Sequence, residues 1–304
     1  MSVSERVVTV VGPTASGKSS LAVALAQRLG GAEIVNADSM QLYRGMDIGT
    51  AKPSVAERGG IPHHLFDVLD VTQSAAVAEF QTWARAAIMD CHRRGVTPIV
   101  VGGSALYVRA ILDRLDFPGT DPDVRDRWKA ALATRGAEAL HAELAARDPA
   151  AAAQILPTNE RRLVRALEVI ELTGEPFVAT MPAYESVFGG LTMLGLDVPR
   201  PVLDVRLAAR VDAMWAAGFV DEVRALRATG LEDGFTASRA LGYQQILAFL
   251  RGEMSEDEAR EATVTGTRKF ARRQDRLFRK DPRIHWLPYD ADDLVDQALA
   301  VIRP

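Results

Sequence analysis

The sequence predicts an α/β fold in which a parallel sheet is flanked by helices, interrupted by an all-helical insertion. Three observations predict it. Apolar strand-like segments alternate with helical segments over the first 116 residues, a glycine-rich loop joins the first strand to the first helix, and strand-like runs are missing from residues 117–190. Alternation of this kind indicates parallel strands with helices on both faces.

The predicted strands of the first part are short and almost entirely apolar, which is typical of parallel strands buried on both faces. Helical periodicity fills the intervals between them. The strands are expected at residues 7–11, 33–37, 64–69 and 97–103, and the helices at 20–26, 77–94 and 106–112.

The middle of the chain has a different character. Residues 117–190 are rich in alanine and form helical segments separated by Pro118, Gly136, Pro149, Pro157 and Gly174. A strand at residues 191–198 then returns to the sheet. Helices are expected at 201–216, 221–229, 238–249 and 255–279, followed by a strand at 283–286 and a helix at 292–302. We therefore predict a core formed by residues 1–116 and 191–304, with residues 117–190 as a helical insertion domain.

The loop at residues 12–19 fits the pattern Gly, four residues, Gly-Lys-Ser/Thr, between a strand and a helix. In this setting backbone N–H groups and the helix N-terminus point at a phosphate. Lys18 adds a positive charge and the Ser19 hydroxyl can ligate Mg²⁺. The alternative is a glycine turn that binds nothing, but strand, spacing, lysine, serine and helix all agree. The loop specifies a P-loop NTPase-like fold without specifying its ligand.

Polar residues follow the predicted strands at the edge where ligands bind in such sheets. Asp38 and Ser39 follow the second strand, and Ser104 follows the strand at 97–103. Asp38 can act as a base or as a partner of Mg²⁺. It can equally be a helix N-cap, the role that propensity alone favours.

Composition restricts the class of protein. No apolar run reaches membrane-spanning length, and residues 1–6 lack a signal pattern, so we expect a cytoplasmic protein with no membrane association. The single cysteine excludes a disulfide framework, and His63-His64 have no further histidine or cysteine at metal-ligand spacing.

The net charge is −4, yet residues 268–283 hold eight basic and two acidic residues. That stripe is either a solvated helix face or a surface for an anionic partner.

An ordered set of segments closely resembles the tRNA dimethylallyltransferase (tRNA isopentenyltransferase, or IPP transferase) family. The resemblance covers nearly the whole chain, and the order of the segments is more specific than any one of them. The segments are GPTASGKS at 12–19, NADSMQ at 36–41, DIGTAKP at 47–53, PHHL at 62–65, VGGS at 101–104, RRLVRALE at 161–168, RALGY at 239–243 and TRKFARRQ at 267–274.

The resemblance implies transfer of a dimethylallyl group from dimethylallyl diphosphate to the exocyclic N6 amine of an adenine. That adenine lies immediately 3′ of the anticodon in tRNAs reading codons that begin with U, and the product is N6-dimethylallyladenosine. The loop would then hold the donor diphosphate and Mg²⁺ rather than a nucleotide triphosphate. The insertion would contact the tRNA anticodon stem-loop, and the target base would be flipped out of its stack. We expect the enzyme to act as a monomer.

The resemblance also implies roles for individual residues. Asp38 would be the base that accepts the amine proton, with Thr14 near the bridging oxygen of the donor and Lys18 on its phosphates. The donor diphosphate would be bound by Gly12, Pro13, Thr14, Ala15, Ser16, Gly17, Lys18, Ser19 and Arg210, with Ser19 as the Mg²⁺ ligand. The tRNA would be bound by Asp38, Ser39, Met40, Gln41, Ser104, Arg125, Arg161, Arg162 and Arg165.

Several alternatives remain open at this point. A P-loop kinase of a small metabolite would share the loop and the sheet, and an adenylate (cytokinin-type) isopentenyltransferase would share the donor. A non-enzymatic RNA-binding switch could also sense a phosphate ligand. Arg210 could form only a surface salt bridge, and Arg161, Arg162 and Arg165 could be an exposed charged helix face.

Overall fold

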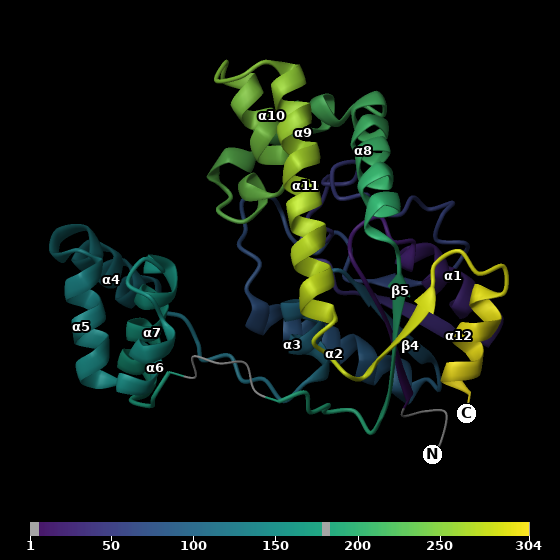
Figure 1. The fold of residues 1–304 in the computed structure, drawn as a ribbon, viewed down its shortest axis with the longest axis horizontal. Coiled ribbons are helices and arrows are strands. Elements are labelled where there is room, and N and C mark those ends of the chain that lie inside the picture. The colour runs from purple at the N-terminus through teal and green to yellow at the C-terminus, as the bar shows by residue number, and fades with distance from the viewer. Residues whose placement is uncertain (1–5, 178–182, 304) are drawn as a thin grey trace. The chain divides into compact units, whose positions relative to one another are not determined.

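The computed structural model describes residues 6–177 and 183–303. The chain divides into two compact units, one of residues 1–113 with 186–304 and one of residues 114–185 (Figure 1). The first unit contains the sheet, and the second is helical.

Six strands form one sheet in the order β3-β2-β4-β1-β5-β6, and every neighbouring pair is parallel. The predicted parallel α/β class is therefore confirmed. β1 lies inside the sheet between β4 and β5, so the loop that follows it emerges at the centre of the carboxyl edge. The strands are β1 Arg6–Val11, β2 Ala32–Asn36, β3 His63–His64, β4 Thr97–Gly102, β5 Gly190–Asp197 and β6 Ile284–Pro288.

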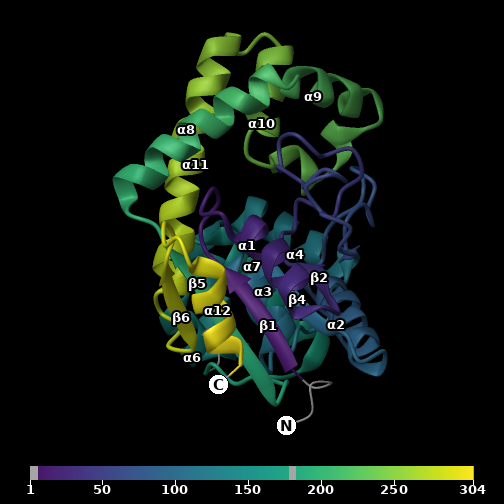
Figure 2. The same ribbon diagram turned by 90° about the vertical axis from the view of Figure 1, so that its right-hand side faces the viewer.

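Both faces of the sheet are covered, as Figure 2 shows. Val8 and Val10 pack with helices α1 and α12, whereas Val7 and Val11 on the opposite face pack with α2 and α3. Successive side chains of a strand point to opposite faces, which is why strands buried on both sides are apolar at every position. These helices are α1 Lys18–Leu29, α2 Val77–Arg93, α3 Ala105–Leu112 and α12 Leu294–Ile302.

Four further helices of the first unit stand beyond the carboxyl ends of the strands (Figures 1 and 2). They are α8 Arg200–Ala216, α9 Phe219–Ala228, α10 Tyr243–Leu250 and α11 Glu256–Phe278. α11 begins with a capping box, in which Ser255 and Glu258 each accept a hydrogen bond from the other's backbone N–H. α11 and α8 pack against each other. These helices therefore enclose the space above the loop that follows β1.

The third strand is shorter than predicted. We expected residues 64–69, but β3 pairs with β2 only through His63 and His64. Leu65 and Asp67 have φ angles of 65° and 57°, in the left-handed region, and these turn the backbone out of the sheet. The apolar pattern of this segment reflects packing of the loop against the core rather than strand pairing.

The second unit has its own hydrophobic core, built from buried residues that include Leu140, Leu144, Leu163 and Leu167. Its helices are α4 Pro122–Arg135, α5 Ala137–Arg147, α6 Pro149–Gln154 and α7 Glu160–Thr173. α4 and α6 each begin with an aspartate cap followed by proline, the residue that suits the first helical position. The helical character predicted for the insertion is therefore present.

Candidate active site

The loop between β1 and α1 has the geometry of a phosphate cradle. Ala15 and Gly17 have φ angles of 64° and 97°, which turn the backbone around an open centre. Lys18 Nζ donates a hydrogen bond to the carbonyl of Pro13 at 3.3 Å. The Ser16 hydroxyl is buried and has no hydrogen-bond partner among the described residues. A buried hydroxyl without a partner fits a loop that is completed by an oxyanion.

Two cavities meet at this loop. The first, which we call the phosphate cavity, has a volume of about 590 Å³ and is lined by Lys18, Ser19 and the adjoining start of α1. The second, which we call the chamber, has a volume of about 510 Å³ and lies under α8, α10 and α11. The residues lining both cavities include Thr14, Asp38, Thr50 and Arg210. The structure thus places two predicted catalytic residues and the predicted clamp Arg210 on the wall between the cavities.

Asp38 is held by local hydrogen bonds at the end of β2. Its backbone N–H donates to Asn36 Oδ1 at 2.9 Å, and its Oδ1 accepts from the N–H of Met40 at 2.9 Å. Its Oδ2 has no hydrogen-bond partner within residues 6–177 and 183–303. Oδ1 therefore has the capping role that propensity favours, while Oδ2 is available to a substrate.

Two cations face the same carboxylate. Burial, followed by the nearby positive charge of Arg210, lowers the pKa of Lys18 to about 8, against an opposing effect of Asp38. Burial also lowers the pKa of Arg210, although Asp38 and Glu57 favour its charged form. Because two partly desolvated cations repel each other here, an anion that binds between them gains attraction and relieves that repulsion.

The chamber combines apolar and basic walls. Apolar side chains from α8 and α9 include Leu207, Met214 and Phe219, whereas Lys269 and Arg273 line it from α11. Ser39, Met40 and Ser104 line it near Asp38. Such a space suits a flat apolar group attached to a polyanion.

The turn after β4 approaches the β2 edge closely. A Cβ on Gly102 would lie 2.5 Å from the carbonyl oxygen of Ala37, so only glycine permits this approach. The approach brings Ser104 to the chamber on which Asp38 also borders. Gln41 faces the other cavity, where its Nε2 donates to the carbonyls of Thr50 and Ala51 at 3.1 and 3.3 Å.

The four arginines predicted to bind tRNA from the insertion fall into two groups within the second unit. Arg125 and Arg165 both pair with the fully buried carboxylate of Glu168, at 2.9 and 3.0 Å. Arg161 and Arg162 are exposed on the first turn of α7. Glu168 therefore fixes two of the arginines, whereas the other two lie at the surface.

Sequence reasoning missed two residues that shape the site. The Glu222 carboxylate accepts hydrogen bonds from the N–H groups of Asp47, Ile48 and Gly49 and from the hydroxyl of Tyr243. It thereby fixes the loop that carries Thr50. The second such residue is Gln274, whose amide bonds to the backbone of Thr14 and Gly103.

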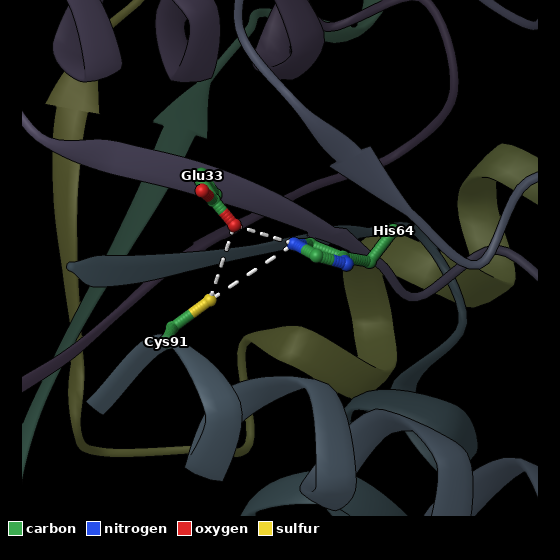
Figure 3. A group of neighbouring side chains, drawn as sticks. All are labelled: Glu33, His64 and Cys91. Carbon is green, nitrogen blue, oxygen red and sulfur yellow. Dashed lines mark hydrogen bonds and ion pairs between the residues drawn. The ribbon is translucent and has the colours of Figure 1, made fainter. Parts of the chain in front are cut away.

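One group outside the cavities resembles a metal site in its composition. Glu33 on β2, His64 on β3 and Cys91 on α2 place their ligand atoms within 4.8 Å of one another (Figure 3). The sequence spacing around His64 did not indicate Cys91, because the topology joins residues that are distant in the sequence. The group is nevertheless held by hydrogen bonds. Both carboxylate oxygens of Glu33 accept from Arg94 at 2.7 Å.

The charge of this group is balanced within the protein. The hydrogen bonds from Arg94, chiefly, lower the pKa of Glu33 to about 2, so its charge is matched by the guanidinium. Burial and the charge of Glu33 raise the pKa of Cys91 to about 12, so the thiol keeps its proton. Because the Glu33 carboxylate bonds to both Arg94 and His64, we assign the group a structural role.

Together the fold and the site define a P-loop protein whose loop borders a second, partly apolar chamber. The sequence model of the IPP transferase family matches residues 41–281. A tRNA dimethylallyltransferase of Thermobifida fusca is 64% identical over 300 residues, covering 97% of this chain and 94% of the relative. The chain belongs to the IPP transferase family.

Solved structures agree with this assignment. The full-length tRNA isopentenylpyrophosphate transferase of Bacillus halodurans is 39% identical, with a TM-score of 0.71 and coverage of 98% of this chain and 97% of the other. A eukaryotic dimethylallyltransferase acting on tRNA is 28% identical, with a TM-score of 0.83 and coverage of 98% and 78%. In the described part of the chain, no helix is long and apolar enough to span a membrane.

Proposed function

We propose that this chain transfers a dimethylallyl group from dimethylallyl diphosphate to the N6 amine of the adenine 3′-adjacent to the tRNA anticodon. The observation that carries the proposal is the shared wall of the two cavities. Asp38, Thr14 and Arg210 border both the phosphate cavity and the chamber. A donor diphosphate in the phosphate cavity and an adenine in the chamber would therefore meet at Asp38.

On the donor side, the loop N–H groups, Lys18 and Arg210 would bind the diphosphate. Mg²⁺, when bound, neutralises charge on a departing diphosphate. The residues present fit it, because Ser19 lines this cavity and its hydroxyl is a hard oxygen ligand of the kind that Mg²⁺ prefers. The buried hydroxyl of Ser16 provides a further polar partner for the anion.

On the acceptor side, the flipped adenine would enter the chamber. The bond between the allylic carbon and the bridging oxygen breaks, and a bond from that carbon to the adenine nitrogen forms. The amine proton passes to Asp38, and pyrophosphate leaves with the electron pair of the broken bond. Thr14, which lines both cavities, would contact the bridging oxygen.

For the tRNA itself, two surfaces support binding. Arg161 and Arg162 are exposed on α7, and Glu168 holds Arg125 and Arg165 in fixed orientations. α11 contributes Lys269 and Arg273 at the chamber. Ser39, Met40, Gln41 and Ser104 would contact the flipped base and its neighbours. We propose that the enzyme acts as a monomer, in the cytoplasm where its tRNA substrate would be found.

The function is tested by incubating the protein with labelled dimethylallyl diphosphate, Mg²⁺ and either unmodified tRNA or AMP. We expect label in tRNA and none in AMP. Label in AMP alone would select an adenylate isopentenyltransferase. Label in neither would exclude prenyl transfer, and ATP-dependent phosphorylation of a small metabolite would then be the reaction to examine.

The pKa of Lys18 predicts how activity depends on pH. A lysine whose pKa is lowered to about 8 carries its charge below that pH and loses it above. Because kcat/KM reports the ionisation of the free enzyme, kcat/KM for dimethylallyl diphosphate should fall as the pH rises through about 8. Steady-state rates on both sides of that pH measure it. In Lys18→Arg, whose side chain stays charged, the remaining activity should lack this fall. A fall that persists in Lys18→Arg would remove Lys18 as its cause.

The exposed arginines predict a change in salt dependence. Replacing Arg161 and Arg162 together by alanine should weaken tRNA binding and reduce the slope of log K against log salt by about one to two. Filter binding over a salt series measures the slope. Arg135→Ala with Arg147→Ala is the matched control, since both pair with Glu143 in the same unit. Equal slopes for the two double variants would show that Arg161 and Arg162 make no specific phosphate contact.

A further inference from the structure

Gln274 joins three segments of the first unit that are far apart in the sequence. Its Oε1 accepts a hydrogen bond from the N–H of Thr14 at 2.9 Å, and its Nε2 donates to the carbonyl of Gly103 at 2.8 Å. The side chain belongs to α11 and is 5% exposed. One amide thus connects α11 to the phosphate loop and to the turn after β4.

The two bonded segments carry residues on the wall of the chamber. Thr14 borders both cavities, and Ser104, next to Gly103, borders the chamber. The N–H of Thr14 is used by Gln274, so it is not one of the loop donors left for a diphosphate. The bond therefore fixes where the loop begins its turn, and with it the position of Thr14.

Gly103 is shaped to receive this amide. A Cβ at residue 103 would lie 2.5 Å from Gln274 Nε2 and 3.4 Å from the carbonyl of Gly12. The atom it meets first is the end of a flexible side chain, which can move aside. Gly103→Ala should therefore leave the fold intact but displace Gln274 from its place between the two segments.

We propose that Gln274 is a positioning residue for the donor: it holds Thr14 and the phosphate loop in register with the turn that carries Ser104. The inference rests on the proposed function. Gln274 itself lines the chamber, but its Oε1 and Nε2 both bond to the backbone, so we assign it to positioning rather than to substrate binding. Losing both hydrogen bonds leaves the Thr14 N–H and the Gly103 carbonyl unpaired, and the loop can relax away from its binding geometry.

The test is Gln274→Met in the full chain, with inorganic pyrophosphate and Mg²⁺ as the binding probe in calorimetry. We expect the Kd for pyrophosphate and the KM for dimethylallyl diphosphate each to rise about ten-fold or more, which corresponds to one lost hydrogen bond to a charge-binding loop. The KM for tRNA should change less than about two-fold, because the basic side chains of α11 remain. The diagnostic result is a rise in the KM for dimethylallyl diphosphate without a matching rise in the KM for tRNA.

The matched control is Gln81→Met on α2, where Gln81 Nε2 donates to the carbonyl of Ala110 at 2.8 Å and borders neither cavity. A purely structural role for Gln274 predicts that both variants lower Tm and leave the pyrophosphate Kd unchanged. That outcome would overturn the proposal.

Gly103→Ala gives an independent approach, also applicable should Gln274→Met fail to fold. It should raise the pyrophosphate Kd by a similar factor, and the double variant should be no worse than the single ones because both remove the same contact. Additive losses would contradict the proposal. Pyrophosphate binding requires no prenyl transfer, so the positioning role fails or holds independently of the proposed reaction.

Discussion

Asp38→Asn should lower the rate of prenyl transfer about 100- to 10,000-fold, the usual contribution of a general base. Asparagine keeps an oxygen that can accept from the N–H of Met40, so the local turn is preserved. It cannot accept a proton from the adenine amine. Single-turnover transfer with enzyme in excess measures the chemical step, and filter binding should show tRNA affinity close to that of the unaltered protein.

The control for this substitution is Asp70→Asn. Asp70 is an exposed carboxylate of the same unit that pairs with Arg44 and borders neither cavity. It should leave the transfer rate within about two-fold, as expected for a surface ion pair. If the transfer rate of Asp38→Asn also stays within about two-fold of the unaltered protein, Asp38 is not the base. A large loss of tRNA affinity in Asp38→Asn would show that Asp38 binds tRNA rather than accepting the proton.

Lys18→Met should lower kcat/KM for dimethylallyl diphosphate about 100- to 1,000-fold, as expected when one preorganised charge is removed from a leaving group. The same change should not destabilise the protein. The pKa of Lys18 is lowered to about 8, so below that pH the folded state disfavours its charge. Methionine removes a partly desolvated cation facing Arg210, and Tm at neutral pH should stay level or rise.

Two measurements on Lys18→Met separate function from stability. Calorimetry with pyrophosphate and Mg²⁺ should show weakened binding, while thermal unfolding without ligand shows no loss. Lys18→Arg keeps the charge in a larger planar group and should retain part of the binding. A Lys18→Met protein that binds pyrophosphate normally would indicate that the loop binds the donor without its lysine.

The sequence was most informative about local features. The strand, loop and helix that contain Lys18 are contiguous, and their pattern predicts both their conformation and their ligand class. The helix at 255–279 was also predicted closely, since the observed α11 spans Glu256–Phe278. The strand at 64–69 was overpredicted, since apolar residues can equally cover a core from a loop whose backbone enters the left-handed region.

The rest of the site depends on contacts between distant residues. Gln274 meets Thr14 across 260 positions, and Glu222 meets Asp47 across 175. No periodicity encodes such pairs. Cys91 could be predicted to be buried, but its place beside His64 follows only from the strand order β3-β2-β4. Glu168 likewise pairs with Arg125 across 43 positions, a contact that follows from packing within the second unit.

The central claim is that the phosphate loop holds a diphosphate that leaves as the allylic carbon is transferred to tRNA. It is tested most directly with dimethylallyl diphosphate labelled separately in the allyl group and in the phosphate, together with Mg²⁺, tRNA and no ATP. We expect the allyl label to enter tRNA while an equal amount of phosphate label appears as pyrophosphate. We also expect no transfer to a tRNA in which guanine replaces the adenine 3′ of the anticodon. A requirement for ATP, or phosphate label retained on the acceptor, would contradict it.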